Sequence, residues 1–298
     1  MHTRKVGQMV KAMTVRDVLN YIEDNFATGI DINDIAQFSG YSRRHIQALL
    51  KQYIGMPIGL YIRKRCIIQA SYLLRLTNIN VIDISLKLGF DSQQSFCREF
   101  KKATGYTPGQ YRRKDSWDLS SLYSHSHVQG VTINSLQFCN LPEGIVSGSH
   151  YNHIIPIPPT PTSHVNRLNI IFEKLDKEKK DIIVLNDFMP HENYTNCLKL
   201  NTIIGTKNET MGSSYNQCRY PSGTFACFSF QFTLHDYPSY SKYIYLVLLP
   251  KYKLTRRPGY DIEIFHYPSH SELSDTINCT YFIPIEPPLD EEVLPHTL

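Results

Sequence analysis

Two short polar runs, about fifty residues apart, carry the side chains of this chain that are best suited to chemistry. Arginine and glutamine dominate both runs. Their N–H donors form paired hydrogen bonds with the edges of purine bases, and arginine also neutralises phosphate. Residues three or four positions apart share one face of a helix, so each run would present its donors together. The pattern indicates recognition of double-stranded DNA, and the residues are Arg43, Arg44 and Gln47 in the first run and Gln93, Gln94 and Arg98 in the second.

The sequence around each run is repeated, which indicates a duplicated structural unit. Residues 34–42 (DIAQFSGYS) are matched by residues 83–92 (DISLKLGFDS), with Asp91 as one insertion. In each copy a glycine permits the positive-φ turn that ends a short helix, and a serine oxygen caps the next helix. This is the helix-turn-helix arrangement, whose second helix enters the DNA major groove. Two copies in register are a much stronger signal than one.

A long helix with one apolar stripe is predicted between the two copies, beginning at Pro57. About twenty helical residues span roughly 30 Å, and successive major-groove faces on one side of B-DNA lie about 34 Å apart. A rigid helix of this length would hold both reading helices against adjacent grooves of one duplex. We therefore expect the protein to bind DNA as a monomer.

The 298 residues favour two domains, and their charge is unevenly divided between them. Residues 1–115 hold 18 Lys+Arg and 9 Asp+Glu, a net charge of +9, whereas the remainder holds 13 and 18, a net charge of −5. Only the first part is therefore expected to face phosphate. We see no signal peptide and no apolar run long enough to span a bilayer, which predicts a cytoplasmic protein without a membrane partner. The seven cysteines are scattered and form no CxxC, which predicts free thiols, no metal site and no cofactor.

The second part of the chain repeats more faintly, with an offset of about eighty residues. Each copy is predicted to run strand, helix, strand, strand, with helices near residues 162–178 and 236–249. Two β-α-β-β units would form a pseudo-symmetric α+β domain with a cleft between them. The predicted fold class is therefore multidomain: an all-α double helix-turn-helix domain (1–115), a polar, serine-rich linker (116–127) and an α+β domain (128–298).

Glu263 is the residue of the acidic part that is best placed to bind a ligand. Period-two alternation in the strand 261–265 puts Ile262 and Ile264 on one face and Glu263 on the other. If the helices cover the isoleucine face, the glutamate points into the cleft, against apolar walls. Such a site suits a cation with an apolar body, whereas the alternative is an exposed strand carboxylate. The predicted ligand-binding residues are Glu263, Phe265 and Tyr220.

Residues 1–113 resemble the DNA-binding domain of AraC-family transcription activators, especially the MarA, SoxS and Rob group. The second part resembles the GyrI-like effector domain over fewer residues. The first resemblance is carried by Gly40-Tyr41-Ser42, Tyr61-Ile62-Arg63-Lys64-Arg65, Asp83-Ile84, residues 89–96 (GFDSQQSF), Arg98, Phe100-Lys101-Lys102, Pro108 and Tyr111-Arg112-Arg113, and the second by Leu254-Thr255-Arg256-Arg257, Gly259, Asp261-Ile262-Glu263 and Ile283-Pro284-Ile285.

The resemblance implies a transcription activator that binds an asymmetric promoter site as a monomer, recruits RNA polymerase and controls efflux, redox and stress-defence genes. It also implies that the second domain senses amphipathic or cationic small molecules, with Glu263 as the acidic residue of its pocket. Arg44 stands where the group has tryptophan and Ala48 where it has arginine, so the first half-site is expected to be read differently. The DNA-binding residues that we predict are Arg43, Arg44, Gln47, Lys51, Gln93, Gln94, Cys97, Arg98, Lys101 and Arg112.

Two other roles for the second domain are left open by the sequence. Some GyrI-like domains are linked to hydrolysis, but the chain shows no nucleophile–His–acid set, phosphate loop or zinc spacing, and we predict that it is not an enzyme. The domain could instead be a module that binds another protein and never a small molecule.

Cys97, beside Arg98, could be a redox-sensitive thiol, although a small residue at a DNA contact is the preferred interpretation.

Overall fold

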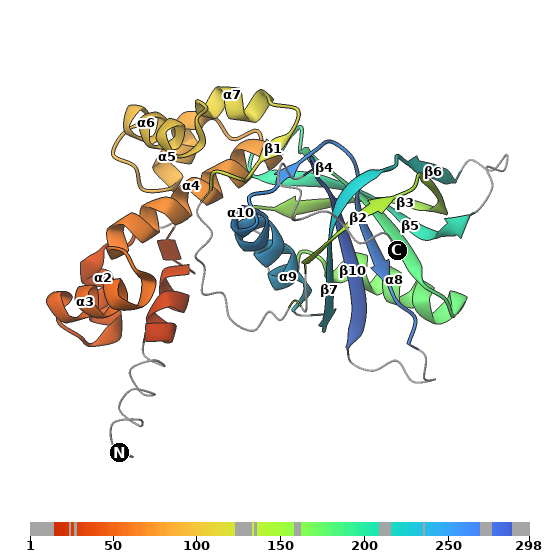
Figure 1. Ribbon diagram of the computed structural model, residues 1–298, viewed down its shortest axis with the longest axis horizontal. Coiled ribbons are helices and arrows are strands. Elements are labelled where there is room, and N and C mark those ends of the chain that lie inside the picture. Colours follow the sequence, from red (N-terminus) through yellow and green to blue (C-terminus); the bar gives the residue numbers. More distant parts are fainter. Residues whose placement is uncertain are drawn as a thin grey trace, which may run out of the picture.

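The computed structural model describes residues 15–23, 25, 26, 29–122, 133, 136–157, 162–208, 216–234, 236–268 and 276–287. Figure 1 shows a helical region formed by the first part of the chain and, beside it, a region built on a sheet from the second part. The expected class, a helical domain followed by an α+β domain, is confirmed. None of the described helices is both long and apolar enough to cross a membrane.

The first helix-turn-helix consists of α2 (Ile32–Ser39) and α3 (Arg43–Ile54). Asp31 forms a capping box with Asp34 at the start of α2. Gly40 takes a φ of 70° where α2 ends, and the Ser42 hydroxyl oxygen accepts a hydrogen bond from a backbone N–H in the first turn of α3. The turn is therefore built by the short-range signals that the sequence displays.

The second helix-turn-helix consists of α5 (Val81–Lys87) and α6 (Gln93–Thr104), followed by the short helix α7 (Pro108–Arg113). Gly89 takes a φ of 68° in the turn, and the Ser92 hydroxyl oxygen caps α6 by accepting from the Ser95 N–H at 3.1 Å. The second copy thus repeats the first in backbone conformation as well as in sequence, as predicted.

The helix α4 (Ile58–Leu76) joins the two copies and is buried over most of its surface. Its 19 residues span roughly 28 Å. Arg65 of α4 is buried and forms an ion pair with Glu23, from a helical stretch over residues 15–23, at 2.7 Å. The Tyr61 hydroxyl donates to the same carboxylate at 2.6 Å. The helical stretch that precedes the first copy is thereby fastened to the connecting helix.

The second part of the chain folds around one eight-stranded antiparallel sheet, in the order β2-β7-β10-β9-β4-β5-β3-β6. The first unit consists of β2, β3, α8, β4 and β5, and the second of β6, β7, α9, β9 and β10. The strand order is symmetric about its centre, because β7-β10-β9 of the second unit mirror β4-β5-β3 of the first. The first strand of each unit, β2 or β6, pairs with the outer strand of the other unit. The predicted pair of β-α-β-β units is confirmed. The elements are β2 (Leu136–Leu141), β3 (Gly144–Pro156), α8 (Val165–Glu178), β4 (Ile182–Pro190), β5 (Cys197–Asn208), β6 (Gln217–Tyr220), β7 (Gly223–Phe232), α9 (Tyr237–Tyr243), the π-helical turn η2 (Ile244–Leu248), α10 (Leu249–Lys251), β8 (Thr255–Arg256), β9 (Asp261–Phe265) and β10 (Ile277–Pro284).

The helices cover the face of the sheet that was expected to stay open. Leu168 of α8 and Tyr237 of α9 pack in one core with Val184 and Phe265, on the face that carries Glu263. Ile262 packs in a second core on the opposite face. The conditional expectation that helices cover the isoleucine face is therefore wrong. The alternation in β9 was read correctly, but alternation alone does not say which face receives the helices.

The segment predicted as a linker is docked over its described residues. The short strand β1 (Trp117–Asp118) pairs with β8, and Leu119 and Leu122 are buried. The Trp117 ring stacks on Tyr245 of η2 with their centroids 5.2 Å apart. Residues 123–127 of the predicted linker lie outside the described residues. The two regions of the molecule are thus in direct contact.

We call the described residues between 15 and 54 the first lobe and residues 81–113 the second lobe. A pair of glycine substitutions tests how closely these two lobes meet. Both Gly40 and Gly89 have positive φ, so alanine at either position is expected to cost about 1–2 kcal/mol of unfolding free energy. A Cβ on Gly89 would also lie 3.0 Å from the Cα of Gly29, whereas one on Gly40 meets nothing. We expect Gly89→Ala to cost roughly 1–3 kcal/mol more than Gly40→Ala in urea unfolding. Equal losses would contradict this close contact.

Candidate nucleic-acid interface and ligand site

The helix α3 presents its predicted contact residues to solvent. Ile46, Leu50 and Ile54 are buried along one side of the helix. The other side carries the polar side chains, and a helix that is apolar on one face only must leave the opposite face available for a partner or for water. The exposed residues of α3 that were predicted to contact DNA are Arg43, Arg44, Gln47 and Lys51.

The helix α6 repeats this arrangement in the second lobe. Phe96 and Phe100 are fully buried, and Cys97 is half-buried at the border between the two faces. Burial raises the pKa of the Cys97 thiol above its ordinary value, so the thiol stays protonated at neutral pH. This environment does not activate Cys97, which opposes the redox alternative. The exposed residues of α6 that were predicted to contact DNA are Gln93, Gln94, Arg98 and Lys101.

Arg112 differs from the other predicted contacts because its guanidinium points inward. Its Nε donates to the carbonyl of Leu74 at 3.1 Å and one of its Nη atoms donates to the carbonyl of Ile79 at 2.5 Å. Arg75 makes similar bonds to the carbonyls of Tyr111 and Asp115. Arg112 thus binds carbonyls at and just after the end of α4, and Arg75 binds carbonyls on and just after α7, so the two arginines fasten α7 to α4.

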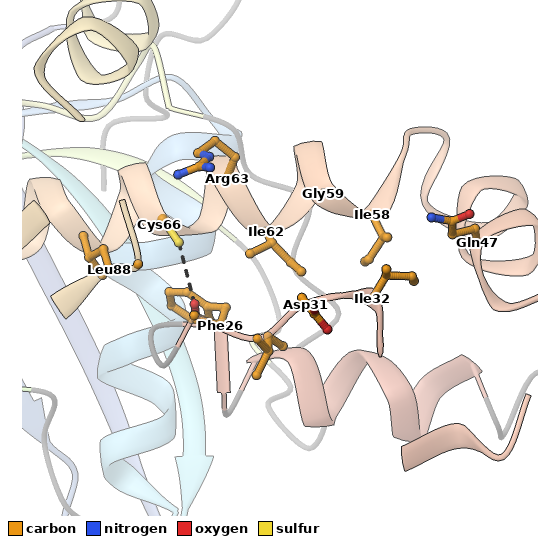
Figure 2. Close-up of a pocket in the computed structure, with 13 residues that line it drawn as sticks. Phe26, Asp31, Ile32, Gln47, Ile58, Gly59, Ile62, Arg63, Cys66 and Leu88 are labelled. Atoms are coloured by element: carbon orange, nitrogen blue, oxygen red, sulfur yellow. Dashed lines mark hydrogen bonds between the residues drawn. The ribbon is translucent and has the colours of Figure 1, made fainter. Parts of the chain in front are cut away.

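A pocket of about 390 Å³ lies between the two lobes, against α4 (Figure 2). Figure 2 shows Ile58 and Ile62 of α4 on one side, Phe26 and Ile32 on the other, and Gln47 of α3 at one end. Of the predicted DNA-binding residues, Gln47 lines this space. The sequence did not reveal the pocket, because its walls come from both lobes and from α4.

The carboxylate of Glu263 is buried and already paired. Its side chain is fully inaccessible to solvent, and it forms an ion pair with Arg167 of α8. Asn186 Nδ2 donates to one oxygen of the same carboxylate at 2.6 Å, and the Tyr237 hydroxyl donates to the other. Arg167 is the residue of this cluster that sequence reasoning missed, since nothing local marks a partner that lies on another element. The alternative of an exposed strand carboxylate is excluded.

The other two predicted ligand residues lie on different faces of the sheet. Phe265 is fully buried near Glu263 and packs against Tyr237, with ring centroids 6.5 Å apart. Tyr220 belongs to the core on the opposite face, with Ile183 and Ile262. The structure therefore brings Glu263 and Phe265 to one region but does not bring Tyr220 to them.

Asp261 forms a second buried polar cluster, at the start of β9. Arg256 binds one of its carboxylate oxygens through Nε at 3.0 Å and through Nη2 at 2.9 Å. The hydroxyl groups of Tyr245 and Tyr281 donate to the other oxygen, at 2.5 and 2.7 Å. Burial is the main cause that raises the pKa of both tyrosines, so both remain hydrogen-bond donors at all ordinary pH values.

The pairing of Glu263 with Arg167 gives a stability prediction. Arg167→Met leaves the carboxylate buried without its counter-charge, and we expect the unfolding free energy to fall by about 3–5 kcal/mol. Replacing both residues, with Arg167→Met and Glu263→Met, removes the charges together and is expected to restore most of that loss. Urea unfolding of the two variants is the measurement, and a double variant as unstable as Arg167→Met would contradict the pairing.

Comparison with known proteins places these features in a family. A model described as a helix-turn-helix domain matches residues 35–114, and one described as a GyrI-like small molecule binding domain matches residues 198–286. The chain is 35% identical over 278 residues to the F1 operon positive regulatory protein of Yersinia pestis, covering 93% of this chain and 89% of that protein. It is 25% identical over 305 residues to the transcriptional regulator Rob of Salmonella typhimurium, covering 93% and 99%.

A third relative, the transcriptional activator AarP of Providencia stuartii, is 43% identical over 115 residues, which cover 39% of this chain and 84% of that protein. The matches therefore extend over both regions, and the sequence resemblance is confirmed. The chain belongs to the AraC-type helix-turn-helix family of DNA-binding transcription regulators, among the members in which a GyrI-like domain accompanies the helix-turn-helix domain.

Proposed function

We propose that this regulator is a transcription activator that binds promoter DNA as a monomer and reads two adjacent major grooves with α3 and α6. The observation that carries the proposal is the pair of exposed polar helix faces joined through one buried helix, α4. The roughly 28 Å length of α4 approaches the separation of about 34 Å between successive grooves. One chain would then contact both half-sites.

The proposed DNA contacts differ in kind along each reading helix. Arginine and glutamine in the first two turns are suited to base edges, because a helix in the major groove places its N-terminal residues closest to the bases. Lys51 and Lys101, toward the C-terminal halves, are suited to phosphate. Arg112 is given a positioning role, since its guanidinium is bonded to backbone carbonyls. The proposed base readers are Arg43, Arg44, Gln47, Gln93, Gln94 and Arg98, with Cys97 beside them.

Activation, rather than repression, is proposed because the relative from Yersinia pestis is named a positive regulatory protein. RNA polymerase is the partner that an activator of this kind must contact, and the family resemblance suggests stress-defence and efflux genes as targets. The proposed DNA-binding domain comprises residues 1–115, and the proposed effector domain comprises residues 128–298. We propose that the protein acts in the cytoplasm, where its DNA lies, and that it has no enzymatic role.

We further propose that the effector domain senses an amphipathic small molecule near Glu263 and changes DNA reading in response. The GyrI-like match supports this role. So does the contact between the domains, since Arg65 Nη1 of α4 donates to the carbonyl of Leu246 in η2 at 3.3 Å. A ligand shifts activity only if it binds two states with different affinity, and a change in how α4 is held supplies two such states. A protein-binding module or a hydrolase is the alternative role for this domain.

A matched pair of arginine substitutions tests the reading of DNA. Arg98→Ala removes a proposed base contact, and we expect DNA binding to weaken by about 1–3 kcal/mol, with relaxed sequence preference at one half-site. Arg219→Ala removes the same charge from an exposed site on β6 and is expected to leave binding unchanged. Footprinting and anisotropy titration measure both effects. Protection of only one groove, or unaltered preference in Arg98→Ala, would refute the proposal.

Sensing by the second domain is tested through DNA affinity. A panel of amphipathic cations, anions and neutral molecules is added to the full chain while its binding to promoter DNA is measured by anisotropy. We expect at least one member to change the dissociation constant by about fivefold or more, the usual lower range of coupling between two sites. If no molecule of the panel changes the DNA affinity, and a pull-down instead shows that the GyrI-like domain of this chain binds another protein, the interaction-module alternative is favoured.

A further inference from the structure

The seam between α4 and the effector domain contains unfilled space. One cavity of about 30 Å³ is lined by Gln69 and Tyr72 of α4 together with His164, Phe188 and Leu246 of the effector domain. A neighbouring cavity of about 60 Å³ is also lined by Tyr72 and Phe188, and by Trp117. Tyr72 and Phe188 thus line both cavities. The interface is therefore less tightly packed than a domain core.

Two residues that line these cavities, His164 through Nδ1 and Trp117 through Nε1, have a buried nitrogen without a partner among the described residues. Arg167, through Nε and Nη1, and His153, through Nε2, have such nitrogens as well, and both lie close enough to His164 to influence its pKa. Arg167 is 1% exposed and uses its Nη2 for Glu263 and Asn186. Leaving a buried donor unsatisfied costs about 1–3 kcal/mol. Several such atoms in one cluster are unusual in a native protein, so we expect a bound molecule to satisfy their hydrogen bonds.

The chemistry of the cluster defines that occupant. Arginine nitrogens only donate, and each neutral imidazole offers one donor and one acceptor, so its unpaired nitrogen donates in one of the two tautomers. Burial, followed by the positive charge of Arg167, lowers the pKa of His164 to about 3 and also lowers that of His153, so both rings are uncharged at neutral pH. The single negative charge of Glu263 is already matched by Arg167. A cation would meet the free donors of Arg167 and a neutralised carboxylate, whereas an anionic acceptor would satisfy those donors, together with the imidazoles in the tautomers that donate.

We propose that Arg167, His164 and His153 bind the carboxylate of a compact amphipathic ligand whose apolar body enters the seam under Tyr72 and Phe188. This inference rests on the proposed sensing function and names its ligand class. The 30 Å³ cavity holds about one or two waters, so a larger guest must displace Tyr72. Because Tyr72 belongs to α4, ligand entry loosens the contact between the effector domain and the helix that carries both DNA-reading lobes.

The proposed carboxylate site is tested by comparing how tightly the full chain binds three molecules that differ only in their head group. Cyclohexylacetate, cyclohexylacetamide and 2-cyclohexylethylammonium share an apolar body and carry negative, neutral and positive heads. Trp117, the single tryptophan of the chain, lies in the seam and reports binding by its fluorescence, since none of the three molecules absorbs where it is excited. We expect the carboxylate to bind about tenfold or more tightly than the amide or the cation, as charged hydrogen bonds require.

Histidine substitutions supply the matched control. His164→Phe keeps the ring that packs on Tyr237 and removes Nδ1, so we expect carboxylate affinity to fall about fivefold while amide affinity is unchanged. His150→Phe, at an exposed histidine of the same strand as His153, is expected to change neither. Equal affinities for the three heads, or undiminished carboxylate binding in His164→Phe, would overturn the inference and leave ordered water as the occupant.

The outcomes also separate this inference from the proposed function. Binding of none of the three molecules, while another amphiphile shifts DNA affinity, refutes the carboxylate site and leaves sensing intact. Preferential binding of the carboxylate without any change in DNA affinity supports the site and refutes its role as a sensor of DNA reading.

Discussion

The buried guanidinium of Arg65 is the interaction on which the arrangement of this molecule depends. It binds Glu23 of the first lobe at 2.7 Å and the Leu246 carbonyl of the effector domain at 3.3 Å, while it belongs to α4, which also supports the second lobe. A desolvated charge tolerates few geometries, because each donor that loses water must find an acceptor. This side chain therefore links the helix that precedes the first helix-turn-helix, the connecting helix and the effector domain.

The effector domain is nearly symmetric in its backbone but not in its charges. The sheet order reads the same from its centre outward for the two units. Glu263 of β9, however, lies opposite Val184 of β4, so the acidic residue of one unit faces an apolar residue of the other. Duplication thus supplied a scaffold, and departures from the duplicated sequence supplied a polar centre within an apolar core. Such a centre is costly unless satisfied, which is why Arg167, Asn186 and Tyr237 converge on the carboxylate.

Aromatic side chains connect the second polar cluster, around Asp261, to the helix that positions the reading lobes. Tyr245 donates to Asp261 through its hydroxyl, stacks on Trp117, and meets the ring of Tyr72 on α4 with centroids 6.3 Å apart. A movement of η2 would therefore be transmitted to α4 through these packed rings rather than through a flexible linker. The two cavities that Tyr72 lines give its ring room to move, which a fully packed interface would not.

The sequence by itself determined the two helix-turn-helix units, the polar faces of α3 and α6, and the paired β-α-β-β units, because these depend on caps, turns and periodicities a few residues long. Gly40, Ser42, Gly89 and Ser92 act on their own neighbours, and so they can be recognised without a fold. Only the tertiary structure decided which face of β9 the helices cover, that Arg112 turns inward, and that residues 117–122 are docked. The pairing of Glu263 with Arg167 belongs to the same class: the two residues are far apart in sequence, and the partner of a buried charge is chosen by topology rather than by any local pattern.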